Sequence, residues 1–139
     1  MSRKAALLVF VNDIVEDVRD YRMLRELLQQ QFEVAMKHNA LRLTELAAQI
    51  SETAGALEKR RKRRSALMGS LPGKNCDITA ILALVNDAAR EAVKARWIEL
   101  EGLVRECKEL NDRNGRLMMD QYAIMQRVLH GEEKIYVPA

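Results

Sequence analysis

Hydrophobic positions in the first quarter of the chain recur every three or four residues. An α-helix turns once in about 3.6 residues, so this spacing gathers them on one side of a helix. Charged residues such as Asp13, Glu16 and Asp20 fall between the hydrophobic positions. The pattern predicts an amphipathic helix over residues 3–36. Its apolar side is formed by Leu7, Val11, Ile14, Val18, Tyr21, Leu24, Leu28, Phe32 and Ala35.

A second helix is predicted over residues 40–68, where the same spacing returns. Asn39 is suited to start it, because an Asn side chain can accept a hydrogen bond from a free backbone N–H of the first turn. Neither Gly nor Pro separates the two segments, so one helix running continuously through residues 37–40 is the alternative. We favour a break. The apolar side of the second helix is formed by Leu43, Ala47, Ile50, Ala54 and Leu57.

The third predicted helix is the longest and covers residues 78–130. The segment before it, residues 69–77, contains two Gly and one Pro and is the clearest loop in the chain. Gly131 follows His130, which is typical of a helix end. These segments predict an all-α fold, an elongated antiparallel three-helix bundle or coiled coil. Residues 1–131 would form a single helical domain, and residues 132–139 a short C-terminal tail.

The apolar arc of the third helix is about 160° wide at 100° per residue. Either this helix contacts both other helices, or part of the arc is open to an amphipathic helix of a partner. Polar Asn114 and Gln121 lie within the arc, as does Asn111, and they would either set the register of the bundle or hydrogen-bond to the partner. One stripe of the arc contains Leu103, Leu110, Leu117, Ile124 and Val128, and the other Leu100, Val104, Cys107, Met118, Tyr122, Met125 and Leu129.

Composition agrees with long helices and excludes most enzyme classes. The chain has 139 residues, of which 48% are hydrophobic, 31% are charged and only 4% are aromatic. It contains no phosphate-binding Gly loop, no paired-histidine zinc motif, no CxxC pair and no nucleophile elbow. We therefore predict no catalytic, cofactor-binding or metal-binding residue and no enzymatic activity. Cys76 and Cys107 are expected to be free thiols of a cytoplasmic protein.

Positive charge is concentrated in one block. The net charge is +3, and residues 59–64 are six consecutive Lys and Arg residues. The block would either bind a polyanion or form a solvated helix end whose charge balances the acidic residues 13–20 or a partner. We favour the second, so no nucleic acid is expected as a partner. The longest N-terminal apolar run, residues 5–11, is shorter than the ~20 residues that span a bilayer, so no stable membrane insertion is expected.

The segment from Leu110 to Leu117 has the sequence LNDRNGRL, which resembles the L-N-x-x-N-G-x-L signature in the last helix of the FlgN family. Members of that family are flagellar export chaperones for hook-associated proteins. Residues 57–61, with the sequence LEKRR, are similar to the family's L-E-x-x-R-R segment. The resemblance covers roughly residues 24–136 and is most specific over residues 107–131.

The resemblance implies a bacterial cytosolic chaperone of the type III export system. It would bind the amphipathic terminal helix of hook-associated subunits at the hook–filament junction and deliver them to the cytosolic domain of the export gate. Tyr136 matches the family's Tyr that docks at the gate, although Val137 follows here where the family usually has Gly. The implied substrate-protein-binding residues are Leu110, Asn111, Asn114, Gly115, Leu117, Met118, Tyr122, Met125, Val128 and Leu129.

Spacing alone supports part of that set. Met118, Tyr122, Met125 and Leu129 follow the i, i+4, i+7, i+11 pattern by which a helix presents anchors to another helix. Two other interpretations stay open at the level of the sequence. The chain can be a basic helical adaptor that binds nucleic acid or an anionic surface through residues 59–64. It can also be a structural coiled coil that self-associates, for example as a homodimer of the free protein.

Overall fold

The computed structural model describes residues 3–69, 82–83 and 85–136. Three long helices are present: α1 (Arg3–Met36), α2 (Ala40–Gly69) and α4 (Asp87–Tyr136). No strand occurs among the described residues. The predicted all-α bundle is therefore confirmed. None of the helices in these ranges combines the length and the apolar character needed to cross a membrane.

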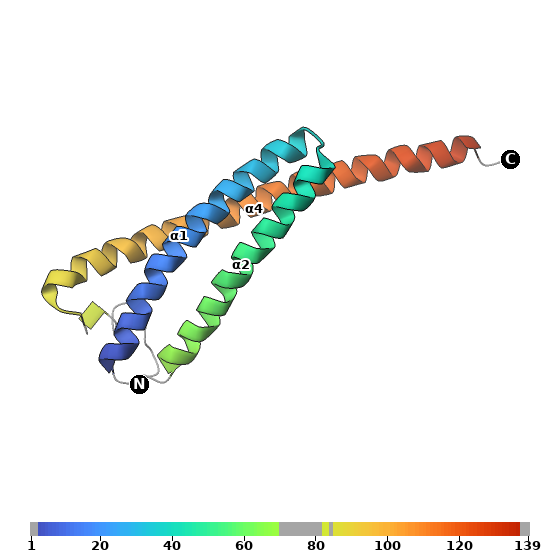
Figure 1. The fold of residues 1–139 in the computed structure, drawn as a ribbon. Coiled ribbons are helices and arrows are strands. Elements are labelled where there is room, and N and C mark those ends of the chain that lie inside the picture. The colour runs from blue at the N-terminus through green and yellow to red at the C-terminus, as the bar shows by residue number, and fades with distance from the viewer. Residues whose placement is uncertain (1–2, 70–81, 84, 137–139) are drawn as a thin grey trace.

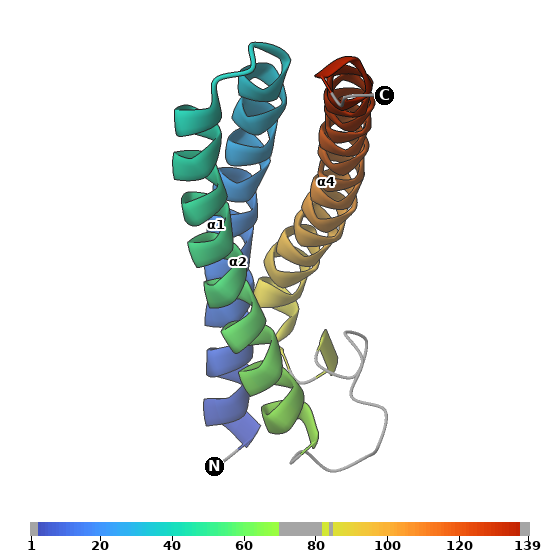
Figure 2. The same ribbon diagram turned by 90° about the vertical axis from the view of Figure 1, so that its right-hand side faces the viewer.

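Helix α1 is the centre of the bundle. It packs on both α2 and α4, whereas α2 and α4 barely pack on each other. Helices α1 and α2 form a hairpin, and α4 lies along α1 and extends beyond the hairpin turn (Figure 1). In the view of Figure 2, α1 and α2 lie side by side and α4 leans away from them toward its C-terminal end.

The contacts between α1 and α4 repeat in a fixed register. Cys107 of α4 contacts the carbonyl of Tyr21 in α1, and Asn114 of α4 contacts the carbonyl of Leu28. The two residues of each pair are 86 positions apart in the sequence. A third pair, Gln121 and Ala35, has the same separation. Steps of seven residues on both helices, in the same direction, are the repeat of a parallel coiled coil. Helices α1 and α4 therefore run parallel, and α2 runs antiparallel to both.

Among the described residues, two clusters of buried apolar side chains lie along α1. The first joins Phe10, Ile14 and Val18 of α1 to Leu100 and Leu103 of α4. In the second, α2 contributes Leu57, which meets Leu24, Leu28 and Cys107. Burial of apolar area contributes roughly 25 cal/mol per Å² to stability, so these clusters hold both other helices on α1.

The chain breaks between α1 and α2 where the sequence predicted it. The Asn39 side chain accepts a hydrogen bond from the backbone N–H of Arg42 at 3.1 Å, which caps the start of α2. His38 has a φ of 55°, in the left-handed region where a helix commonly ends. The alternative of one continuous helix through residues 37–40 is therefore wrong.

The start of α4 differs from the predicted start at residue 78. The helix begins at Asp87, and Asn86 caps it by accepting a hydrogen bond from the backbone N–H of Ala89 at 2.9 Å. Leu82 and Ala83 are helical, but Val85 and Asn86 interrupt the helix. The sequence did not reveal this cap because it follows directly after an apolar run that ends at Val85, and neither Gly nor Pro marks the break in the helix. Residues 70–81 and 84 lie outside the described residues.

The end of α4 also differs, because the helix continues through Gly131 to Tyr136. A Gly inside a helix costs about 1 kcal/mol relative to Ala, which does not stop a helix by itself. The next strong breaker is Pro138, and the residues between are compatible with a helix. The predicted tail is therefore helical over residues 132–136, and residues 137–139 lie outside the described part.

Candidate functional site

The part of α4 beyond the hairpin turn carries exposed hydrophobic side chains. Near the end of α1, Gln121 Nε2 of α4 donates a hydrogen bond to the Ala35 carbonyl at 2.8 Å. After Gln121 the helix continues to Tyr136, and we call residues 122–136 the α4 overhang. The exposed fractions of its large apolar residues lie between 50% and 67%, and the residues are Tyr122, Ile124, Met125, Val128 and Leu129.

The overhang is exposed because α1 ends before α4 does. Positions 107, 114 and 121 of α4 face α1 at intervals of seven residues, and Val128 takes the next position in that repeat. No part of α1 remains to cover it, since α1 ends at Met36. The overhang therefore presents the continuation of an established helix–helix interface without its second helix. Exposed apolar surface of this kind is typical of interaction sites.

Asn114 faces inward and fixes the register of α4 on α1. Its side chain is 1% exposed, and its Nδ2 donates to the Leu28 carbonyl at 2.6 Å and to Gln31 Oε1 at 2.9 Å. The Arg113 guanidinium donates to Asn114 Oδ1 and lies over the Phe32 ring, 3.8 Å from its centroid. Of the two roles open to the amide from the sequence, the register contact is the one observed. Asn114 has no surface left for a substrate helix in this structure.

The ten predicted binding residues fall into three groups along α4. Leu110 packs on the second core cluster, so it belongs with Asn114 inside the bundle. Gly115, Leu117 and Met118 are partly buried at the border of the overhang. The exposed group consists of Asn111, Tyr122, Met125, Val128 and Leu129.

The sequence set omitted two exposed residues of α4. Ile124 belongs to the predicted apolar arc, and Met119, 73% exposed, lies outside both stripes. Periodicity gave the signal for Ile124, but its exposure depends on where α1 stops. Tyr136, the predicted gate-docking residue, was expected in a tail after the helix end, but it is the last residue of α4.

We predict that replacing Asn114 with Ala lowers the free energy of unfolding by about 1–3 kcal/mol. The change removes a buried hydrogen-bonded side chain and leaves Gln31 and Arg113 without their partner. Urea unfolding followed by circular dichroism measures the loss. Asn111→Ala is the matched control, because Asn111 is exposed, and it should change stability by less than about 0.5 kcal/mol. Equal losses for both variants would contradict the inward role of Asn114.

The basic block is paired with acidic residues of α1. Arg60 bridges Asp17 and Asp20, each at 2.5 Å. Arg64 contacts Asp17 at 2.6 Å, and Arg63 contacts Asp13. The charge balance with residues 13–20 that the sequence favoured is observed as ion pairs, but Arg60 is buried in the α1–α2 interface instead of solvated. Three of the block's cations hold α2 on α1.

Burial and ion pairing both affect the pKa of Arg60. Its side chain is only 9% exposed, and Asp17 is 3% exposed. Burial lowers the pKa of the guanidinium, but hydrogen bonds with Asp20 and Asp17 outweigh that effect and leave the pKa above its ordinary value. Arg60 therefore stays charged and serves as a structural bridge between α1 and α2. It is not available to a polyanion.

Cys107 is a packed thiol. Burial, with a smaller contribution from nearby Glu106, raises its pKa to about 11. Its Sγ lies 3.5 Å from the Tyr21 carbonyl, and it forms no disulfide. A thiol with so high a pKa is almost wholly protonated at neutral pH and is a poor nucleophile or metal ligand. Cys76 lies outside the described residues.

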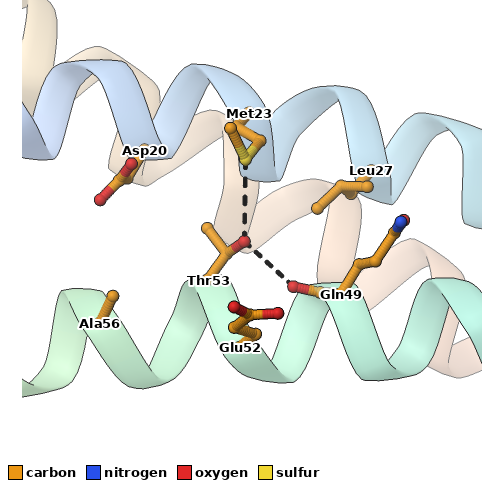
Figure 3. Close-up of a pocket in the computed structure, with 7 residues that line it drawn as sticks. All are labelled: Asp20, Met23, Leu27, Gln49, Glu52, Thr53 and Ala56. Carbon is orange, nitrogen blue, oxygen red and sulfur yellow. Dashed lines mark hydrogen bonds between the residues drawn. The ribbon is translucent and has the colours of Figure 1, made fainter.

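A shallow hollow between α1 and α2 shows no arrangement suited to catalysis. Figure 3 shows Met23 and Leu27 of α1 facing Gln49 and Thr53 of α2 across it. The Thr53 hydroxyl donates to the Gln49 carbonyl at 3.0 Å, within its own helix. Among the described residues, no cluster of His, Cys, Asp and Glu is placed to hold a metal ion.

Comparison with known proteins identifies the family. The family model described as FlgN protein matches residues 11–130, which is most of the chain. Neither the curated proteins nor the solved structures include a significant match. The matched region contains the whole coiled-coil register of α1 and α4 and the exposed apolar residues as far as Leu129. The chain therefore belongs to the FlgN family of flagellar export chaperones.

Proposed function

We propose that this chain is a cytosolic chaperone that binds the amphipathic terminal helix of a hook-associated flagellar subunit along the last turns of α4. It then delivers the subunit to the cytosolic domain of the type III export gate. The observation that carries the proposal is the α4 overhang, whose apolar residues continue the α1–α4 interface with no helix to cover them. Membership of the FlgN family supports the class of partner.

An amphipathic helix is the partner whose chemistry fits the overhang. Tyr122, Met125 and Leu129 present apolar anchors at helical spacing, and each buried apolar side chain of that size contributes roughly 1.5–3 kcal/mol. Met side chains are flexible and polarizable, so Met118 and Met125 can adapt to more than one subunit. Binding would cover the apolar side of the subunit's terminal helix and keep it from associating before export.

The predicted binding residues then serve in two ways. Tyr122, Met125, Val128 and Leu129 would contact the bound helix, because their side chains are exposed. Asn114, with Leu110, would act indirectly by holding α4 on α1, so that the overhang keeps its direction. Arg60, Arg63 and Arg64 are already engaged in ion pairs with α1. Nucleic-acid binding by the basic block therefore has less support.

Titration of the purified protein with synthetic terminal helices of the hook-associated subunits tests the proposal. Calorimetry should give one site per chain for at least one subunit. A peptide of the same composition whose apolar side is replaced by Ser should not bind. The rival functions give other results: co-purification with nucleic acid would favour the basic adaptor. Concentration-dependent self-association that the peptide does not disrupt would favour the structural coiled coil.

Tyr136 is proposed to act after subunit binding, at the gate. We predict that Tyr136→Ala leaves the affinity for the subunit helix within a factor of about two and lowers the affinity for the gate's cytosolic domain at least about tenfold, or ~1.4 kcal/mol. Tyr136 ends α4, almost two helical turns after Leu129, so a separate contact is feasible. Pull-down with the isolated gate domain measures the second effect. Loss of subunit binding in this variant would refute the separation of the two contacts.

A further inference from the structure

The signature residues of the last helix point to different sides of α4. Asn114 faces α1, where it is buried and hydrogen-bonded. Asn111 is exposed, and Gly115 is partly exposed. At about 100° per residue, Asn111 and Gly115 lie on the same side of α4 as the exposed anchors of the overhang. The resulting stripe has alternating spacings of four and three residues and consists of Asn111, Gly115, Met118, Tyr122, Met125 and Leu129.

Nothing in the folded chain requires Gly at position 115. A Cβ added to Gly115 would meet no atom within 4 Å, so no neighbouring helix packs against it. The residue lies within regular helix, where Gly is a poorer helix former than Ala. Gly102 is in the same situation, but at 100° per residue it lies on the other side of α4, away from the stripe. The space beside Gly115 is therefore open on the side where the proposed partner would lie.

The stripe also continues an interface that already exists. Toward the N-terminus of α4, Cys107 lies on nearly the same side, in the second core cluster, which joins Leu24 and Leu28 of α1 to Leu57 of α2. The opposite side of α4 is used differently, since Arg113 lies over Phe32 of α1 and Glu106 pairs with Arg25 at 3.4 Å. The stripe thus begins beside the seam where α4 meets both α1 and α2, on its α2 side, where α2 and α4 barely pack together.

We propose that the bound subunit helix crosses α4 most closely at Gly115. It would enter on the α2 side beside Asn111 and follow the stripe to Leu129. This inference rests on the proposed function and specifies the path of the partner. The distance between two packed helix axes, about 8–10 Å, depends on the side chains at the contact, so a residue without a side chain allows the closest approach. The stripe spans 18 residue steps, or about 27 Å, which is room for five turns of a bound helix.

Matched substitutions at the two glycines of α4 test the crossing point. Gly115→Ala and Gly102→Ala should each raise the melting temperature by about 3–5 °C, because Ala favours the helix and its methyl group has open space at both positions. Only the Gly115 variant should bind the subunit helix more weakly, by about threefold to tenfold. Gly115→Leu should weaken binding by more than about tenfold, whereas Gly102→Leu should leave it unchanged. Calorimetry with the synthetic terminal helix and thermal unfolding are measured on all four variants.

The outcomes separate this inference from the proposed function. If the unmodified protein binds the helix and the Gly115 and Gly102 variants bind it equally well, the crossing point is wrong while the proposed function stands. Tighter binding by Gly115→Ala would also overturn the crossing, since it would mean that binding needs only a more stable α4. If the unmodified protein binds no terminal helix, both proposals fail. Should Gly115→Leu misfold, the Ala variant still decides.

Discussion

Replacing Met125 and Leu129 together with Ser is expected to weaken binding of the subunit helix by about 3–6 kcal/mol. Each side chain would be buried by the bound helix, and each burial contributes roughly 1.5–3 kcal/mol. In the free protein both side chains are at least half exposed, so removing them creates no cavity. The melting temperature should therefore change by less than about 2 °C. Calorimetry and thermal unfolding are measured on the same variant.

Two controls distinguish an effect on binding from an effect on stability. Ala123 and Arg127 are exposed on the other side of the overhang at about 100° per residue, and replacing both with Ser should leave binding unchanged. Leu103 lies in the first core cluster, and Leu103→Ala should lower the free energy of unfolding by about 2–5 kcal/mol. If the Met125 and Leu129 variant lost stability as Leu103→Ala does and kept its binding, these residues would be core and not site.

Replacing Arg60 with Met is expected to lower the free energy of unfolding by about 3–5 kcal/mol. Met has a similar length but no charge, so Asp17 and Asp20 would lose their bidentate partner within a buried interface. Removing one partner of a buried ion pair costs this much because the other charge stays desolvated. Urea unfolding measures the loss. Lys62→Met is the control, since Lys62 is 70% exposed and its contact with Glu58 is 3.9 Å long.

A second variant separates charge from packing. Changing Asp20 to Asn together with Arg60→Met removes the negative charge that has lost its buried partner and should recover part of the lost stability, while Asp17 keeps its ion pair with Arg64. Equal effects of Arg60→Met and Lys62→Met would contradict the bridging role of Arg60. The cluster lies far along α1 from the overhang, so folded Arg60→Met protein should still bind the subunit helix with unchanged affinity.

The sequence was sufficient to predict the helices and the apolar side of each helix. Apolar spacing of three and four residues depends only on the geometry of a single helix, which is why residues 3–36 and 40–68 were predicted nearly to the residue. The break at Asn39 was predictable for the same reason, because a cap is a contact within one turn. The pairing of residues 59–64 with residues 13–20 followed from complementary charge on neighbouring helices. The signature around Asn114 pointed to the family.

The limits of α4 were less predictable, because they depend on competing local signals. Gly131 is a typical residue after a helix end, but the next proline in the sequence is Pro138, and α4 continues to Tyr136. At the other end, Asn86 caps the helix within an apolar run that periodicity alone assigns to the helix. Each signal is worth about 1 kcal/mol, so small differences decide which one prevails.

Periodicity shows which residues of a helix share a side, but the coverage of that side depends on the other helices. Asn114 and Met125 both lie within the apolar arc of α4, yet Asn114 is buried and Met125 is exposed. The difference arises because α1 and α4 run parallel in a register offset by 86 residues, and α1 ends at Met36. That register is set by contacts between residues far apart in the chain, which no local pattern encodes. The sequence by itself determined the helices and their apolar sides, and only the tertiary structure decided which apolar stretch of α4 stays exposed.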